Sequence, residues 1–117
     1  MLTFRIQAEG KTEMSGALAF ITNYVSSDVS VIDTSTNGIA GTVTVGAGPV
    51  GVAVSPDGST AFVSNSGGNN LSVIDTSTLS VTSTITLGAN TDPSGIAISP
   101  SGTTLYLNQA WFEAQIA

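Results

Sequence analysis

Short apolar runs alternate along the chain with clusters of Gly, Ser, Thr, Asn, Asp and Pro, and this pattern predicts β-strands joined by turns. Residues 50–54 place large apolar side chains beside small ones, as expected of a strand packed on both faces. Residues 81–87 alternate, with Val81, Ser83, Ile85 and Leu87 on one face and threonines on the other, which predicts a half-exposed outer strand. Helix is disfavoured in these runs because glycine, proline and β-branched residues fill them.

The predicted strands recur with a period of 42 residues, so the chain contains an internal repeat. At this offset residues 19–23 align with 61–65, and the two copies of Val-Ile-Asp-Thr-Ser-Thr at 31–36 and 73–78 coincide. An offset of 44 aligns residues 49–62 with 93–106. Repeats of about 40–45 residues that hold four strands are typical of β-propeller blades. We therefore predict an all-β fold, an incomplete β-propeller of four-stranded antiparallel blades.

The repeat divides the chain into five parts. They are a divergent N-terminal segment at 1–16, a three-stranded partial blade at 17–48, a complete blade at 49–88, a two-stranded partial blade at 89–109 and a divergent tail at 110–117. Residues 2–6 alternate and predict either a substitute first strand or a leader outside the propeller. From Asn108 onward the composition favours a helix capped by Asn108, a short strand or a frayed tail. Trp111 and Phe112 are predicted to cover the open face of the last blade.

About two and a half blades cannot close a ring, because closed propellers use about four to eight. The expected partners are therefore other propeller blades of a longer polypeptide or identical chains in a homo-oligomer, and the third alternative is an open stack with exposed strand edges. Phe20, Phe62 and Tyr106 share one position of the repeat. We predict that they stack as an aromatic ladder in the core between blades.

Three sequence segments carry a resemblance to a known family. They are Ser-Val-Ile-Asp-Thr-Ser-Thr at 30–36 and 72–78, Gly-Val-Ala-Val-Ser-Pro-Asp-Gly at 51–58, and the Phe-Ile-Thr-Asn and Phe-Val-Ser-Asn of the second strands. Over residues 17–108 the chain resembles the YVTN β-propeller repeat of archaeal and bacterial surface-layer and secreted proteins. The resemblance implies a propeller scaffold but says little about activity, since related propellers occur in lactonases and in quinoprotein or copper enzymes.

The charge distribution excludes two classes of partner. The net charge is −6, and the only basic residues, Arg5 and Lys11, precede the repeat. Because phosphate binding needs Lys and Arg, we predict no nucleic-acid partner and no anionic membrane surface. No stretch approaches the roughly 18 apolar residues of a membrane helix, so no membrane insertion is expected, and residues 1–16 lack the apolar centre of a signal peptide. The neutral polar composition suits an extracellular or cell-surface protein.

Only the acidic residues are candidates for chemistry. The chain has no cysteine and no histidine, which excludes thiol nucleophiles, cysteine or histidine metal sites, histidine-ligated haem and a Ser-His-Asp triad. The acids inside the repeats are Asp28, Asp33, Asp57, Asp75 and Asp92, and those outside are Glu9, Glu13 and Glu113. Asp33 and Asp75 occupy one repeat position, which indicates turn residues, and Asp57 lies in a predicted hairpin turn.

Two further patterns are weak. The oxygen-rich loops at 22–28 and 65–70 lack the acid density of a calcium site. Asn70-Leu71-Ser72 matches the N-glycosylation pattern, which arises easily by chance. We therefore assign no catalytic, cofactor-binding or metal-binding residue and predict no cofactor.

These observations leave three hypotheses for function. The first is a non-enzymatic cell-surface or secreted repeat module with a structural or protein-interaction role. The second is a piece of a larger propeller enzyme or ligand-binding protein, lactonase-like or quinoprotein-like, whose site lies in blades outside this chain. The third is a truncated chain without independent function. The resemblance and the missing catalytic residues favour the first, so the sequence predicts that the chain is not an enzyme.

Overall fold

The computed structural model describes residues 2–7, 17–109 and 115–116, and these form β-strands and turns without a helix. Three antiparallel sheets follow one another along the chain. The strands are β1 (Leu2–Gln7), β2 (Leu18–Asn23), β3 (Asp28–Asp33), β4 (Gly38–Thr44), β5 (Pro49–Val54), β6 (Thr60–Asn65), β7 (Asn70–Asp75), β8 (Ser80–Thr86), β9 (Pro93–Ile98), β10 (Leu105–Gln109) and β11 (Gln115–Ile116). Within the described residues, no helix is long and apolar enough to cross a membrane.

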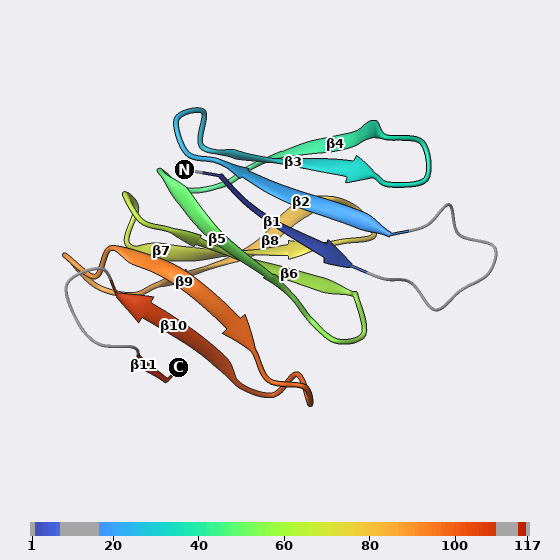
Figure 1. The fold of residues 1–117 in the computed structure, drawn as a ribbon. Coiled ribbons are helices and arrows are strands. Elements are labelled where there is room, and N and C mark those ends of the chain that lie inside the picture. The colour runs from blue at the N-terminus through green and yellow to red at the C-terminus, as the bar shows by residue number, and fades with distance from the viewer. Residues whose placement is uncertain (1, 8–16, 110–114, 117) are drawn as a thin grey trace.

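The sheets are arranged as consecutive propeller blades (Figure 1). Strands β1, β5 and β9 are the innermost strands of the three blades and lie side by side, and β5 contacts both of the others. Strands β4 and β8 form the outer edges of the first and second blades. The prediction of an incomplete all-β propeller is confirmed, and the stacking follows because a single sheet of this kind cannot bury its own faces.

The first blade has the order β1-β2-β3-β4, so residues 2–7 provide its innermost strand. Strand β1 pairs with β2 from Leu2 opposite Asn23 to Gln7 opposite Leu18. Of the two alternatives for this segment, the structure shows the strand. The pairing extends over six residues without the register shift that separates Pro49 from Gly51 in β5.

The third blade consists of β9, β10 and the two-residue strand β11. Asn108 lies inside β10, so it does not cap a helix, and this part of the expectation for the tail is wrong. The reason is that Gln109 still pairs with Pro93, which keeps the backbone extended. Trp111 and Phe112 lie outside the described residues.

A hydrophobic core lies between the first two blades. It combines Phe20, Val29, Val31 and Val43 of the first blade with Val52, Val54, Ala61, Val63 and Ile74 of the second. Burying one such side chain contributes about 1.5–3 kcal/mol before entropy is counted, so this interface is a main source of stability. The aromatic ladder forms only in part: Phe20 is fully buried, Phe62 is half-buried and Tyr106 is 42% exposed.

Strand β8 differs from its predicted pattern. All of its residues are exposed, and a register shift against β7 makes Ile74 pair with Val81 while Val73 pairs with Ser83. The extra residue, Thr82, turns Val81 to the opposite face from Ser83 and Ile85. The prediction that Val81, Ser83, Ile85 and Leu87 share one face is therefore wrong, because strict alternation does not survive a bulge.

Candidate functional site

The repeated aspartates Asp33 and Asp75 close the turns that follow the third strand of each blade. The Asp75 carboxylate accepts hydrogen bonds from the Ser77 backbone N–H (2.8 Å) and hydroxyl (2.7 Å). Asp33 accepts the same pair from Ser35, at 2.9 and 2.6 Å. These hydrogen bonds, with the Ser77 hydroxyl as the largest cause, hold the pKa of Asp75 below its ordinary value of 3.8. Both carboxylates are thus turn-forming groups.

The threonine after each aspartate ties this turn to the neighbouring segment of its blade. The Thr76 hydroxyl donates to the Gly58 carbonyl at 2.6 Å, and its N–H donates to the Ser59 carbonyl at 3.1 Å. In the first blade, the hydroxyl and the N–H of Thr34 both donate to the Ala17 carbonyl. The Asp-Thr-Ser-Thr motif therefore joins two turns at one end of the blade, which explains its recurrence as a structural feature.

Hydroxyls on the second strands cross from one blade to the next. Thr22 of β2 donates to the Val50 carbonyl at 3.0 Å, and Ser64 of β6 donates to the Ser94 carbonyl at 2.6 Å. Both hydroxyl residues are fully buried. The contact also requires Gly51, because a Cβ added there would overlap the Ser94 carbonyl oxygen and lie 3.0 Å from the Ile96 Cγ2. This link was not predicted from the sequence. The signal that could have indicated it is the repeat itself, because Thr22 and Ser64 are 42 residues apart and their acceptors, Val50 and Ser94, are 44 residues apart.

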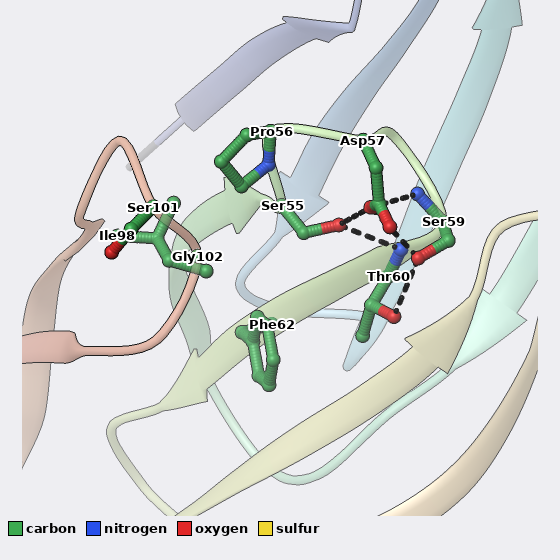
Figure 2. A pocket seen from close by; sticks show the side chains of 9 residues that line it. All are labelled: Ser55, Pro56, Asp57, Ser59, Thr60, Phe62, Ile98, Ser101 and Gly102. Carbon is green, nitrogen blue, oxygen red and sulfur yellow. Dashed lines mark hydrogen bonds between the residues drawn. The ribbon is translucent and has the colours of Figure 1, made fainter.

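Asp57 lies in the tight turn between β5 and β6, beside a pocket of about 310 Å³ (Figure 2). Its Oδ1 accepts hydrogen bonds from the Ser55 hydroxyl (2.7 Å), the Ser59 N–H (3.0 Å) and the Ser59 hydroxyl (2.8 Å). These bonds, led by that from Ser55, lower the pKa of this exposed carboxyl from 3.8 to about 2. Asp57 is therefore ionised at every physiological pH.

The pocket lies between equivalent turns of the second and third blades. Its other walls come from Phe62 on β6 and from Ile98, Ser101 and Gly102 around the β9–β10 turn. Hydroxyls, one carboxylate and one aromatic ring can contact a small polar molecule. They do not make an acid–base pair, because Asp57 is the only titratable residue among the described residues of the lining.

A second pocket of about 280 Å³ separates the innermost strands β5 and β9. Its lining is apolar and consists of Val52, Ala53, Ile96, Ala97 and Ile98. These residues offer van der Waals contact and backbone groups, and no side chain among them can transfer a proton or bind a metal ion.

The remaining candidates are engaged in local structure. Asp28 accepts hydrogen bonds from the Asn23 amide (2.9 Å) and the Ser26 hydroxyl (2.8 Å), and the Asp92 N–H donates to the Asn69 Oδ1 at 3.0 Å. Across the residues that the structure describes, no group of three or more His, Cys, Asp or Glu side chains could hold a metal ion. Glu9, Glu13 and Glu113 lie outside those residues.

The glycosylation pattern falls on side chains that the fold uses. Asn70 Oδ1 accepts a hydrogen bond from the Asn65 amide at 2.8 Å, and the same amide donates to the Ser72 hydroxyl at 2.9 Å. Ser72 is 2% exposed, and Asn65 is fully buried with an Oδ1 that has no hydrogen-bond partner among the described residues. This network anchors the β6–β7 loop and leaves the Ser72 hydroxyl inaccessible in the folded protein.

Several solved structures are similar to this chain. Hydrazine synthase of Kuenenia stuttgartiensis has a TM-score of 0.77 and 33% identity over 89% of this chain and 28% of its own. A protein of unknown function from Desulfotomaculum acetoxidans DSM 771 has a TM-score of 0.73 with 17% identity, covering 96% of this chain and 39% of that one. The dihydro-heme d1 dehydrogenase NirN, in complex with DHE, has a TM-score of 0.68 with 22% identity, covering 79% and 20%.

Sequence comparison adds a short match. The PE-PGRS family protein PE_PGRS18 of Mycobacterium tuberculosis (strain ATCC 25618 / H37Rv) is 54% identical over 41 residues, which is 35% of this chain and 9% of that protein. No family model matches the chain. The chain spans between about a fifth and two fifths of the solved structures and about a tenth of this relative.

The prediction that the chain is not an enzyme is contradicted by the kind of protein to which the similar structures belong. Hydrazine synthase and NirN, two of the similar structures, are enzymes, so propeller structures similar to this chain occur in enzymes. That prediction rested on the residues within the chain alone. A propeller that serves as a scaffold need not carry the reacting groups on every blade, so their absence from three blades was a poor criterion.

Proposed function

We propose that this chain supplies blades to the β-propeller of a larger enzyme or ligand-binding protein, whose reacting groups lie outside these 117 residues. The observation that carries the proposal is the similarity to hydrazine synthase, at 33% identity over 89% of the chain with a TM-score of 0.77. That similarity involves only 28% of the solved chain, which leaves room for the rest of a propeller and for other domains.

The side chains of the described blades support a scaffold role. Asp33, Asp57 and Asp75, the acids that sequence analysis considered for chemistry, each accept hydrogen bonds from a serine within their own turn. Among the described residues that line the pocket beside Asp57, that carboxylate is the single titratable group. The blades are instead joined by buried hydroxyl–carbonyl bonds, which fix their mutual orientation and thereby the geometry of whatever site the complete propeller holds.

The test is to isolate the native protein from the source cells with an antibody raised against this chain, and to sequence its peptides by mass spectrometry. We expect further 42-residue repeats, in the same polypeptide or a bound one, with His, Arg or Glu at the starts of strands. The isolated material should be assayed for lactone hydrolysis, dye-linked dehydrogenation and hydrazine formation. A native protein of 11.7 kDa that copurifies with no other propeller and has no activity would overturn the proposal.

We also propose an extracellular or cell-surface location. Its support is the composition, in which only 9% of residues are charged and Ser, Thr, Gly and Asn dominate the loops, together with the resemblance to repeats of secreted proteins. Digestion of intact cells with an impermeant protease should remove the antibody signal. A signal that persists until the cells are lysed would contradict this location.

A further inference from the structure

Two faces of this chain can be compared position by position, because the first and second blades are related by the 42-residue repeat. Phe20, Val31 and Val43 of the first blade face the second blade, as their strand pairing and their shared core show. The equivalent residues of the second blade are Phe62, Val73 and Ile85, here called the outer strip, and they face the third blade.

The two faces differ in how well they are covered. Phe20 and Val31 are fully buried and Val43 is 4% exposed. In the outer strip, Phe62 and Val73 are only half-buried and Ile85 is 43% exposed. Leu71, the equivalent of the buried Val29, is the exception at 2% exposed. At the other three positions apolar side chains occupy matched strands, so the difference reflects what lies opposite each face.

The first blade is covered by the outer half of its neighbour. Ile74 of β7 belongs to the core that contains Phe20. Leu79, in the turn between β7 and β8, lies so close to β4 that its Cδ1 would be 2.8 Å from a Cβ added to Gly41. In the third blade, the described residues supply β9, β10 and only two residues beyond β10. No equivalent of the β7–β8 hairpin is present among them.

The edge of β10 already has the register that such a hairpin requires. Tyr106 pairs with Ile116 as Phe62 pairs with Val73, and Leu107 pairs with Gln115 as Val63 pairs with Ser72. The two residues of β11 therefore occupy the position of a third strand of the blade, and this position extends beyond them.

We propose that the outer strip is a docking surface for a β-hairpin of the repeat type, the third and fourth strands of a complete third blade. Its first strand takes the place of β11 beside β10, in the same register, and its apolar residue at the Ile74 position packs against Phe62. The proposal rests on the proposed function, since this hairpin belongs to the part of the propeller outside the chain.

One sequence difference between the first and second blades limits which residue the turn of this hairpin can carry. Ser83 stands where the first blade has Gly41, at the point that Leu79 approaches. A leucine in the docked turn would meet the Ser83 side chain, so the residue at that position must be smaller. Asn37 holds this position in the first blade and has the same left-handed backbone, with a φ of 60° beside 55° for Leu79.

The probe is a synthetic peptide with the sequence of residues 28–44, which is the outer hairpin of the first blade and carries Asn37. We expect saturable binding to the full chain by NMR titration, with the largest shifts at the Phe62 ring and the Ile85 methyl groups. New amide protection should appear along β10 beyond Tyr106 and Leu107, the positions that β11 already pairs. Ile85→Lys should weaken binding at least about tenfold. The matched control is Ile39→Lys in the full chain. Ile39 also lies on a fourth strand, but it pairs with Ile32 and is 65% exposed on the other face of its blade, so this variant should bind the peptide as the parent chain does.

Three results would overturn the docking surface: no saturable binding, equal binding of a scrambled peptide, or equal effects of the two lysine variants. A peptide with Asn37→Leu should bind more weakly than the parent peptide, and equal binding would refute the role given to Ser83. If these binding tests fail but the native protein contains further repeats, only the docking surface is refuted. Absence of such repeats would remove the proposed function itself.

Discussion

The second and third blades approach each other closely at Gly51, and Gly51→Ala is the substitution that tests this contact. An added Cβ would overlap the Ser94 carbonyl oxygen of β9 and lie 2.9 Å from the Ser64 Oγ. The obstacle is backbone, which cannot rotate away as a side-chain end can. The second and third blades must therefore separate or tilt to admit a single methyl group.

The expected loss of stability has two parts. Overpacking of a close interface costs about 1–3 kcal/mol. Separation also breaks the buried 2.6 Å hydrogen bond from Ser64 to the Ser94 carbonyl, which adds about 1 kcal/mol. Together they lower the free energy of unfolding by about 2–4 kcal/mol. For a chain of this size that corresponds to a fall in Tm of roughly 10 °C.

The control is Gly95→Ala, at the equivalent position of the third blade. Among the described residues, an added Cβ there meets only Asn108, at 3.5 Å from its Cβ, which is ordinary contact. Replacing glycine at such a site is neutral or stabilises by about 0.4–1 kcal/mol through the unfolded chain. Urea unfolding followed by circular dichroism measures both variants. Equal midpoints for Gly51→Ala and Gly95→Ala would refute the close approach of β5 and β9.

Three other outcomes follow from the structure. Ser64→Ala should lower the free energy of unfolding in urea by about 1–3 kcal/mol, because it leaves the Ser94 carbonyl and the Gly51 N–H without this hydrogen-bond partner. Ser101→Ala, at an exposed serine, should leave the free energy of unfolding almost unchanged. Equal losses would contradict the blade-to-blade hydrogen bond. Phe20→Ala should lower the free energy of unfolding by about 3–5 kcal/mol and Tyr106→Ala by much less, because Phe20 is fully buried and Tyr106 is 42% exposed. Equal losses for the two variants in the same denaturation assay would disprove this. The carboxyl of Asp57 should titrate near pH 2 by carbon-13 NMR, and because its folded pKa is depressed from 3.8, its contribution to stability is present above pH 4 and lost as the pH falls toward 2. Ser59→Ala should move this midpoint toward 3.8, and a midpoint near 3.8 in the parent protein would contradict the hydrogen-bonded turn.

The strands and their order could be predicted because local chemistry and the repeat agreed. Asp33 and Asp75 mark the same turn twice, and the structure shows each with the same pair of serine hydrogen bonds. The details that depend on three-dimensional neighbours could not be predicted. The register shift at Thr82 turns Val81 away from Ile85, and nothing in the alternating pattern signals a bulge at that residue.

The links between blades were harder to predict than the blades. A buried hydroxyl such as that of Ser64 has the same sequence pattern as a solvent-exposed one, because alternation does not show which face meets another sheet. The pocket beside Asp57 also depends on a turn 44 residues further along the chain, around Ser101. The prediction about enzymatic activity failed for a related reason, since it considered the residues of this chain without the protein to which such blades belong.

The central claim is that the sheets stack as propeller blades, with the second strand of one blade against the innermost strand of the next. Its most direct test is a nuclear Overhauser experiment on protein with labelled phenylalanine rings and valine methyl groups. The structure predicts contacts from the Phe20 ring to the methyl groups of Val52 or Val54, which share its core. Contacts within each sheet without any contact from Phe20 to β5 would show independent sheets and would contradict the propeller account.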